Sequence, residues 1–586
     1  MVRKPKELKQ PLNLADLFYS ASEKFAGNEA LKYKVGHHYE QLTYQELREE
    51  TLKLASVLKK LGFQPGDKAI IFSENRPEWV VTDLALISLG GINVPIHSVL
   101  SSAQLEVIIK EIQPKVLLFS NRELGEKLVE ISKTISTIPF VFSYEKPEKA
   151  GIKDVKYFKT EINGQKVTAT ESTEIVDKAI KIEPKSLATI IYTSGTTGHF
   201  KGVKLSHQNI LFDVLAVVKW VHVFPTDRFF SILPLSHIFE RTIGYYIPLL
   251  SGASIGYATD LAKVSQEIKE RRPTIVIAVP RLFEKIYEKI IEKVNKSFFK
   301  KAIFRFAFGL KKNGQHKRLE KVFEKLVFSK VRAEFGGQIR FFVSGGAALP
   351  TKLGKFFDQV GLTILEGYGL TETSPVISCN RLEDYSFGTV GPVLDGIKAK
   401  ISASGEVVVK GSNVTQGYLK NSDTKSSFTA DGWFKTGDYG YFDRKGFLVI
   451  TGRKKDLIVL STGKKVSPTI IESAIESSPY IDQAFVFGDA RKHIGAIVVP
   501  NLEKMTEKFD NLSPQKVIKN EKLFEFLTEE MRELLKKFAS YEKVYKFIVQ
   551  PEKFSIENGE LTPKLSLRRH VIYEKNLEEI ENIYKK

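Results

Sequence analysis

The sequence predicts an α/β protein: a large N-terminal domain of parallel sheets flanked by helices, a small antiparallel barrel-like unit, and a smaller α+β C-terminal domain. Short apolar, β-rich runs alternate with helical stretches over the first two thirds of the chain. This alternation is typical of parallel sheets with helices on both faces. Shorter β runs with Gly-containing turns follow. Ser467 and Pro468 then supply a capping hydroxyl and a first-turn proline, which predict a new helix.

The parallel sheets are predicted from five short runs, four of which end in Ser or Thr. The run Lys68–Ser73 is followed by a stretch with helical spacing, Pro77–Leu89. Because ligands bind at the carboxyl ends of strands in such sheets, motifs directly after these runs are candidates for chemistry. The other four runs are Lys115–Ser120, Ala188–Thr193, Thr274–Val279 and Ile339–Ser344.

The later part of the chain has a different pattern. Short β runs at Lys398–Ile401, Glu406–Lys410 and Phe447–Thr451 are separated by Gly-containing turns and predict the antiparallel unit. The C-terminal domain is expected to contain strands at Gln483–Gly488, Gly495–Pro500 and Lys546–Gln550.

The composition is that of a globular protein. Of the 586 residues, 42% are hydrophobic and 27% are charged, which excludes collagen-like, fully disordered and disulfide-stapled chains. The single cysteine, Cys379, cannot form an intramolecular disulfide, so a reducing compartment is expected. Neither a signal-peptide pattern nor a run of about 20 apolar residues is recognisable. We therefore expect a cytoplasmic protein, with peripheral membrane association left open.

The chain is strongly basic, with a formal net charge of +19. Such an excess predicts an anionic partner, which could be nucleic acid, a membrane surface or a phosphorylated substrate. Segment 285–332 contains fifteen Lys or Arg and four Glu, with Phe residues interspersed. A basic, aromatic-rich helical stretch is typical of a membrane-surface contact. The alternative, a solvated helical pair with its Phe residues in the core, has equal weight.

The segment Tyr192–Val203 reads YTSGTTGHFKGV and follows an apolar run. Its glycines let backbone N–H groups approach phosphates, its hydroxyls donate hydrogen bonds, and its lysine supplies charge. The spacing is not that of a Walker A motif. A polyphosphate-binding loop explains this composition better than a generic turn does. The candidate phosphate-binding residues are Thr193, Ser194, Gly195, Thr196, Thr197, Gly198 and Lys201.

This loop resembles the phosphate loop of the adenylate-forming superfamily, which contains acyl-CoA synthetases, beetle luciferases and peptide-synthetase adenylation domains. Four further motifs resemble those of the superfamily and occur in its order. They are Ser344–Pro350, Glu366–Thr373, Thr436–Asp438 and Gly452–Asp456. The resemblance implies an N-terminal adenylate-forming domain over residues 1–454, including the basic segment 285–332, and a mobile C-terminal domain over residues 455–586.

The resemblance also implies roles in binding ATP and Mg²⁺. Tyr368 offers a face to the adenine, and Thr371 can hydrogen-bond a phosphate or the acyl carboxylate. Glu372 supplies an oxygen ligand of the kind that Mg²⁺ prefers, together with Thr193. The carboxylate of Asp438 would accept from the ribose hydroxyls. The implied ATP-binding residues beyond the loop are Glu366, Gly367, Tyr368, Thr371, Asp438 and Arg453.

Three stretches look like those of long-chain fatty acyl-CoA synthetases: Leu233–Arg241, Val279–Tyr287 and Phe487–Gly495. By this resemblance His237 lines the acyl site near the carboxylate, although a satisfied core histidine is the alternative. Arg241 occupies the position where some bacterial relatives have a gating tryptophan. The glycine-rich turn implies acyl-binding positions at Gly345, Gly346 and Ala347.

The sequence departs from the superfamily near its C-terminus, where an adenylation lysine is expected in a Thr-x-x-Gly-Lys-x-x-Arg pattern. Aligning on Thr562 and Arg569 places Ser566 at the lysine position, and Lys564 lies two residues earlier. Residues two apart on an extended segment face the same side, about 6.6 Å from each other. We therefore predict Lys564 as the adenylation lysine. The predicted catalytic residues are Lys564, Thr371, His237 and the hinge residue Lys455.

The function implied by the resemblance is ATP-dependent activation of long-chain fatty acids to acyl-CoA through an acyl-adenylate, with Mg²⁺ as cofactor and ATP and CoA as cosubstrates. One alternative enzyme transfers the acyl group to a carrier protein or uses another carboxylate. Another alternative is a pseudoenzyme that binds acyl chains and nucleotide without turnover. No recognition motif supports nucleic acid as a partner. The oligomeric state is left open, a homodimer included.

Overall fold

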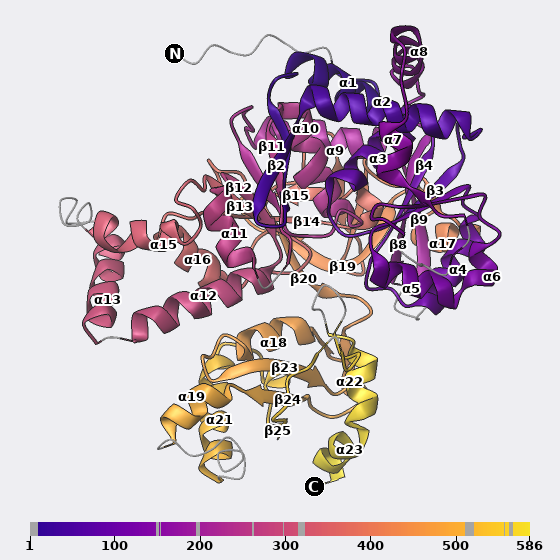
Figure 1. The fold of residues 1–586 in the computed structure, drawn as a ribbon. Helices are drawn as coiled ribbons and strands as arrows, with labels where there is room; N and C mark the ends of the chain where they lie inside the picture. The colour runs from indigo at the N-terminus through magenta and orange to yellow at the C-terminus, as the bar shows by residue number, and fades with distance from the viewer. Residues whose placement is uncertain are drawn as a thin grey trace. The chain divides into compact units, whose positions relative to one another are not determined.

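The computed structural model in Figure 1 describes residues 10–147, 152, 154–194, 200–260, 263–296, 298–313, 323–509, 521–555, 557–561 and 567–585. Contacts divide the chain into two compact units. Unit 1 comprises Met1–Leu349, Gly354–Ala399 and Val409–Phe434, and unit 2 comprises Pro350–Leu353, Lys400–Val408 and Lys435–Lys586. Unit 2 thus begins upstream of residue 455, and the domain boundary between residues 454 and 455 stays a prediction. Within the described ranges, no helix combines the length and apolarity needed to cross a bilayer.

The first sheet of unit 1 has eight strands. Its centre, from β8 to β7, is parallel, and the pairs β8–β9 and β9–β18 are antiparallel. β3 pairs with both β4 and β5, so the chain reverses its winding direction at β3. In sheet order the strands are β18 (Gly417–Tyr418), β9 (Phe200–Ser206), β8 (Leu187–Ser194), β4 (Ile92–Ile96), β3 (Lys68–Phe72), β5 (Val116–Phe119), β6 (Phe140–Ser143) and β7 (Lys156–Tyr157).

The second sheet of unit 1 also has eight strands. It is parallel from β1 to β14, and β2 and β15 add antiparallel edges. In sheet order the strands are β15 (Val376–Cys379), β14 (Ile364–Gly369), β13 (Phe341–Ser344), β12 (Ile275–Ala278), β10 (Arg228–Ser231), β11 (Ser254–Tyr257), β1 (Glu29–Val35) and β2 (His38–Thr43).

The helices of unit 1 cover these sheets, and several begin at capping side chains. Thr43 and Glu46 form a capping box at the start of α2, as Ser206 and Asn209 do for α9. The helices are α1 (Leu14–Lys24), α2 (Tyr44–Lys60), α3 (Pro77–Ser88), α4 (Ser102–Ile112), α5 (Arg122–Glu130), α6 (Ser132–Ile135), α7 (Phe158–Asn163), α8 (Ala169–Ala179), α9 (His207–Trp220), η1 (Glu240–Tyr246), α10 (Ile247–Ser251), α11 (Val264–Arg271), α12 (Pro280–Asn295), α13 (Phe298–Asn313), η2 (Glu324–Phe328), α15 (Ser329–Ala333), α16 (Thr351–Gln359), η3 (Thr371–Thr373) and α17 (Asn421–Ser427).

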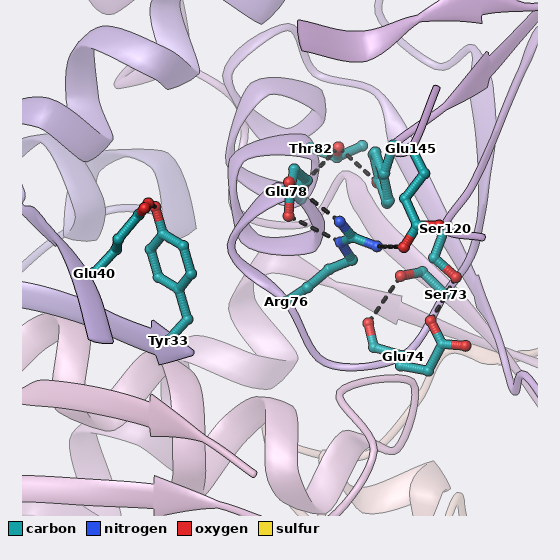
Figure 2. A network of polar contacts seen from close by, with 10 residues as sticks. Tyr33, Glu40, Ser73, Glu74, Arg76, Glu78, Thr82, Ser120 and Glu145 are labelled. Carbon is teal, nitrogen blue, oxygen red and sulfur yellow. Dashed lines mark hydrogen bonds and ion pairs between the residues drawn. The ribbon is translucent and has the colours of Figure 1, made fainter. Parts of the chain in front are cut away.

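A polar network fixes the start of α3 at the carboxyl end of β3, as Figure 2 shows. Arg76 precedes the helix, and its guanidinium pairs with Glu78 at 2.9 Å and Glu145 at 3.5 Å. Glu74 accepts from the Ser120 hydroxyl after β5. Pro77 at the first helical position completes a well-defined helix start. The network therefore fixes where the buried face of α3 meets the sheet.

α3 carries the most deeply buried ion pair in the described chain. Asp83 pairs with Arg241 of η1, and both side chains are fully buried. Asp83 also accepts from the Tyr246 hydroxyl at 2.7 Å and from the Asn93 amide at 2.7 Å. Burial disfavours the Arg241 charge, but the Asp83 carboxylate holds the Arg241 pKa above its ordinary value. Arg241 also donates to Thr189 at 2.8 Å.

This ion pair joins the two sheets. Asp83 packs with the first sheet, whereas η1 contacts β10 and β12 of the second sheet. Arg241 therefore does not line an entrance in the way that a gating tryptophan would, because its side chain is sealed inside the domain. Arg241 occupies the sequence position of a gate, but its full burial indicates that it joins the two sheets instead.

Unit 2 contains a four-stranded sheet and a three-stranded sheet. The predicted antiparallel unit is confirmed, with one more strand, β19, that the sequence reading missed. Its register shifts at Tyr439 and Gly440, which interrupts the alternation expected of a strand. The strands and helices of this region are β16 (Lys398–Ile401), β17 (Glu406–Lys410), β19 (Phe434–Phe442), β20 (Leu448–Arg453), β21 (Ile458–Val459), β22 (Lys465–Val466), α18 (Pro468–Ile475), β23 (Ile481–Phe487), β24 (Gly495–Pro500), α19 (Leu502–Lys508), α21 (Glu521–Leu534), η4 (Ser540–Glu542), β25 (Lys546–Val549), α22 (Arg569–Lys575) and α23 (Leu577–Lys585).

The buried pair makes a stability prediction. Arg241→Met removes the cation that pairs with the buried Asp83 carboxyl group, so we expect the free energy of unfolding to fall by about 3–5 kcal/mol. Arg122→Met is the matched control, because Arg122 pairs with Glu126 on an exposed helix face, where 87% and 62% of the side chains are accessible, and such pairs contribute about 0–1 kcal/mol. The measurement is the urea midpoint of tryptophan fluorescence. Equal midpoint shifts in the two variants would contradict this role.

Candidate active site

The strand pair β8–β9 presents the described part of the phosphate loop. Thr193 lies opposite Lys201 in the antiparallel register, and its hydroxyl contacts the Lys201 carbonyl at 3.5 Å. Ser194 ends β8. Its side chain and the predicted residues Gly195, Thr196, Thr197 and Gly198 lie outside the described residues.

Lys201 belongs to a polar cluster that reaches the predicted metal ligand. Its Nζ pairs with Asp423 of α17 at 2.9 Å and lies 5.4 Å above the Tyr418 ring. The Tyr418 hydroxyl donates to Glu372 at 2.8 Å. The structure thus brings Thr193, Lys201 and Glu372 into one cluster, which we call the phosphate-side cluster together with Tyr418 and Asp423. The sequence reading missed the last two, which lie in a segment without a motif.

The donor chemistry of this cluster fits Mg²⁺. A carboxylate and a hydroxyl are hard oxygen ligands, and Mg²⁺ commonly binds through one or two carboxylates together with substrate phosphates. Within the described ranges, no group of three or more His, Cys, Asp or Glu residues could hold a metal alone. The cluster therefore suits a cation that arrives with a polyphosphate.

Hydrogen bonds with Asn413 and Asp213 fix the segment that carries Glu372. The Asn413 amide donates to the carbonyls of Thr373 at 2.9 Å and Val376 at 2.8 Å. The Val376 N–H donates to Asp213 at 2.6 Å. Burial raises the pKa of Asp213 well above its ordinary value. Asp213, missed in the sequence reading, has a recognisable signal: it is an acid inside the apolar run 210–218 of helix α9.

Close backbone packing explains a glycine of this segment. A Cβ on Gly369 would lie 1.6 Å from the Pro375 carbonyl oxygen, so only glycine fits. Tyr368 and Gly367 pair with β15 at the end of β14, and Thr371 begins η3 directly after it. The predicted adenine-side residues are therefore presented by one continuous strand and turn.

Glu366 lies on the same strand and is buried. Burial raises its pKa to about 7, although the Gly388 and Leu349 backbone N–H groups favour the charged form. The Gly388 N–H lies 3.4 Å from the carboxyl group. Near neutral pH this group therefore changes charge beside the predicted nucleotide site.

The acyl-side residues gather where the two sheets of unit 1 present their carboxyl ends. His237 follows β10, and its ring lies 4.9 Å from that of His97, which directly follows β4. His97 was missed, although its position after a strand is the signal used for other motifs. Phe239 packs on the glycine-rich turn, because a Cβ on Gly345 would lie 2.8 Å from its ring. Gly346, with a φ of +82°, and Ala347 complete this turn.

Glu240, three residues after His237, is a second missed group. Its side chain is fully buried, and among the described residues neither carboxyl oxygen has a hydrogen-bond donor in bonding geometry. Burial raises its pKa to about 8, with the Ser231 hydroxyl as the nearby group that opposes this rise. A Cβ on Gly244 would lie 2.4 Å from Glu240 Oε1, so a glycine makes room for the acid.

The remaining predicted ATP-binding residues belong to unit 2. Asp438 on β19 faces Arg453 on β20, and their charged atoms lie 3.4 Å apart. Asp438 is buried and Arg453 half-exposed. Gly437 turns the chain with a φ of +74°, and Thr436 donates to the Val407 carbonyl at 2.7 Å. The exposed Lys455 lies in the turn after β20.

The predicted lysine segment is only partly described. Lys564 and Ser566 lie outside the described residues, between Leu561 and Leu567, which form an antiparallel bridge. Arg569, the arginine of the aligned pattern, pairs with Glu472 of α18 and donates to the Val486 carbonyl at 3.1 Å. Arg569 therefore anchors the segment to the domain.

Candidate residues at the carboxyl ends of parallel strands, in sheets flanked by helices, are typical of α/β enzymes. Sequence comparison gives the family. The chain belongs to the AMP-binding enzyme family, whose model matches residues 18–419. A model of the AMP-binding enzyme C-terminal domain matches residues 455–586.

Curated relatives span most of the chain. It is 32% identical to long-chain-fatty-acid–CoA ligase FadD15 of Mycobacterium bovis, over 93% of this chain and 92% of the relative. Fatty acyl-CoA synthetase A of Dictyostelium discoideum is 31% identical, over 93% and 86%. A chloroplastic long-chain-fatty-acid–[acyl-carrier-protein] ligase of Arabidopsis thaliana, AEE15, is 28% identical, over 97% and 86%.

Solved structures share the fold. The adenylation domain of a Mycobacterium chelonae carboxylate reductase superposes with a TM-score of 0.78 at 21% identity, covering 100% of this chain and 92% of that one. The anthranilate CoA ligase AuaEII, solved with anthranoyl-AMP, superposes with a TM-score of 0.74 at 20% identity, covering 97% and 98%.

Glu366 makes a pH prediction. Its raised pKa keeps it neutral below about pH 7, and above this pH it adds a negative charge beside the predicted nucleotide site. Glu366→Gln stays neutral at every pH. We therefore expect the ratio of the ATP Kd of wild type to that of the variant to rise several-fold between pH 6 and 8.5, measured by calorimetry. The ratio cancels the ionisation of ATP itself.

Glu383→Gln is the control for this titration, because Glu383 is an exposed acid of the same unit. The ratio of the wild-type ATP Kd to that of Glu383→Gln should stay constant between pH 6 and 8.5. A constant ratio for Glu366→Gln as well would show that this acid does not face the bound nucleotide.

Proposed function

We propose that the chain is a ligase that activates long-chain fatty acids to acyl-CoA at the expense of ATP, releasing AMP and pyrophosphate. The observation that supports this most is the phosphate-side cluster, which joins the loop lysine to the acidic turn within the AMP-binding fold. The relatives at 32% and 31% identity that are named long-chain-fatty-acid–CoA ligase and fatty acyl-CoA synthetase support the substrate class.

In the proposed first step, a fatty acid carboxylate oxygen attacks the α-phosphorus of ATP. The new bond is the carboxylate O–Pα bond, and the bond from Pα to the bridging oxygen of pyrophosphate breaks. Such a reaction needs charge neutralisation more than acid–base chemistry. Lys201 would exchange Asp423 for a phosphate, and Thr371 would hydrogen-bond a phosphate or the acyl carboxylate. Thr193 and Glu372 would hold Mg²⁺, which supplies further positive charge to the phosphates.

In the proposed second step, the CoA thiol loses its proton to solvent and its sulfur attacks the acyl carbon; the C–S bond forms, the bond from the acyl carbon to the AMP oxygen breaks and AMP leaves. His237 with the turn Gly345, Gly346 and Ala347 would position the acyl carboxylate, and Asp438 and Arg453 would bind the ribose. Lys455 lies in a turn between strands, which suits the role of a hinge at which the C-terminal domain rotates between the steps.

We also propose that the enzyme works in the cytoplasm and associates peripherally with membrane. The basic segment 285–332 supports this, because its charge lies outside every motif that carries chemistry. A long-chain acid partitions into lipid, so a membrane surface is where this substrate is concentrated.

A substrate panel tests the function. Fatty acids of graded length are incubated with ATP, Mg²⁺ and CoA, and AMP is measured. We expect AMP and acyl-CoA in equal amounts, with the highest kcat/KM for long chains. If no acid yields AMP, the chain is a pseudoenzyme and the proposal fails.

A carrier-protein ligase is a second candidate, because the Arabidopsis relative carries that activity in its name. The same panel is repeated with a phosphopantetheinylated acyl carrier protein in place of CoA. Acyl transfer to CoA at the higher kcat/KM supports the main proposal, whereas acylation of the carrier protein alone reverses the assignment.

The predicted adenylation lysine is tested by comparing Lys564→Ala with Ser566→Ala. We expect the lysine change to lower pyrophosphate release about 100-fold or more, because a charge on the transferring phosphoryl group is lost. The reaction of preformed acyl-adenylate with CoA should stay near the wild-type rate, which separates the role from a folding defect. Lys537→Ala, at an exposed position of the same unit, is the control. Loss of adenylation in Ser566→Ala alone would show that the alignment is wrong.

A further inference from the structure

Helix α13 has apolar side chains on two faces, and one of them is part of the core. Phe304 is 8% exposed and Ala307 is 1% exposed. The Phe308 ring stacks on Phe356 of α16 with centroids 5.4 Å apart and meets the edge of Phe328 at 5.5 Å. This face accounts for part of the aromatic content of segment 285–332 in the way that the solvated-helix interpretation predicts.

The other face is exposed to solvent. Phe299, Ile303 and Phe306 are 77%, 47% and 55% exposed. Their spacing of four and three residues places them in one stripe along the helix. The Phe306 ring contacts Phe323 at 5.4 Å, and Leu326, 54% exposed, follows three residues later on η2. We call Phe299, Ile303, Phe306 and Leu326 the α13 stripe.

The stripe differs from ordinary surface apolarity. Single exposed apolar residues are common on proteins, but a contiguous row marks an interaction surface. Figure 1 shows α13 standing out from the sheets of unit 1, and the exposed fractions of the stripe residues show that solvent reaches them. A structural role in the core does not explain the exposed row, because α13 already has a separate buried face.

Exposed cations are frequent on the elements that precede and follow α13 in the chain. Lys285 and Lys289 on α12, Lys325 on η2 and Lys330 on α15 are exposed, and they form no ion pair with any described residue. Positions 300, 301 and 305, between the stripe residues in the sequence, are also Lys or Arg. An apolar row set in basic residues matches the boundary between the headgroups and acyl chains of an anionic bilayer.

The charge distinguishes the bilayer from a second copy of the chain. Two copies that met at this surface would bring two segments with fifteen Lys or Arg and four Glu each into contact, and like charges repel. Nucleic acid would neutralise the charge but would leave the apolar row without a role.

We propose that the α13 stripe inserts into anionic membrane while exposed lysines of the same segment bind lipid phosphates. The purpose of this docking rests on the proposed function: it would place the acyl site beside a bilayer that contains the fatty acid. Docking itself requires neither ATP nor turnover.

The test uses the full chain and three variants. The stripe variant carries Phe299→Gln, Ile303→Gln and Phe306→Gln, with glutamine chosen because it is a good helix former. The charge variant carries Lys285→Gln, Lys289→Gln, Lys325→Gln and Lys330→Gln. The control variant carries Val107→Gln, Val129→Gln and Phe224→Gln, which replace three apolar residues of unit 1 that are 60%, 37% and 47% exposed.

Binding is measured by sedimentation with phosphatidylglycerol or phosphatidylcholine vesicles, without ATP, CoA or acid. We expect wild type and the control variant to bind phosphatidylglycerol vesicles, and both the stripe and the charge variant to bind at least tenfold more weakly. Phosphatidylcholine vesicles should bind poorly, and salt should weaken binding to phosphatidylglycerol. Circular dichroism and AMP formation from a water-soluble, shorter acid show whether each variant is folded.

Two outcomes overturn the inference. The first is equal binding of wild type and the stripe variant to anionic vesicles, or equal binding to both lipids. The second is a dimer in wild type that dissociates in the stripe variant, which would assign the stripe to a second copy. Because binding is measured without substrates, failure of the ligase proposal leaves this test unaffected, and a failed vesicle test leaves the substrate panel unaffected.

Discussion

The arrangement of unit 1 depends on the buried ion pair between Asp83 and Arg241. The two residues are 158 positions apart and belong to elements packed on different sheets. Thr193 and Lys201 come from the first sheet, whereas the acidic turn with Glu372 and the glycine-rich turn come from the second. The distance between these groups is therefore set by how the sheets meet. A buried pair is a poor source of net stability, since desolvation offsets its attraction. We infer that its value here is specificity, because a packing of the sheets that separated the two side chains would leave buried charges without a partner.

A second constraint concerns acids that are buried near the site. Burial raises the pKa of Asp213 well above its ordinary value, that of Glu240 to about 8 and that of Glu366 to about 7. Both proposed substrates, ATP and a fatty acid, are anionic. Protonated acids can fill polar positions around such a site without adding negative charge to it. Asp213 illustrates such a position, because burial raises its pKa and it accepts from the Val376 N–H, which holds the Glu372 segment from the core.

Much of the fold and of the candidate site could be predicted from the sequence, and the residues that were missed were missed for physical reasons. The parallel runs and the five motifs are local signals, since strand periodicity, glycine and hydroxyl content are written in consecutive residues. His97 and Asp213 have local signals, a position after a strand and an acid in an apolar run, but their roles depend on contacts across the fold with His237 and Val376. Tyr418 and Asp423 join the phosphate-side cluster from a segment without a motif. The burial of Arg241 could not be read from its motif, because a motif gives position in the chain but not packing.

The ion pair between Lys201 and Asp423 bears on how the phosphate side selects its ligand. The two side chains are 32% and 24% accessible, so the pair is partly solvated and contributes at most about 1 kcal/mol. A ligand with one carboxylate gains little by displacing Asp423, because it replaces one carboxylate with another. A polyphosphate gains more, because it also reaches the hydroxyl of Thr193 and carries its own cation to Glu372. The pair between Lys201 and Asp423 thus disfavours the binding of simple carboxylates at Lys201. In the proposed reaction the fatty acid carboxylate binds instead at His237 and the glycine-rich turn.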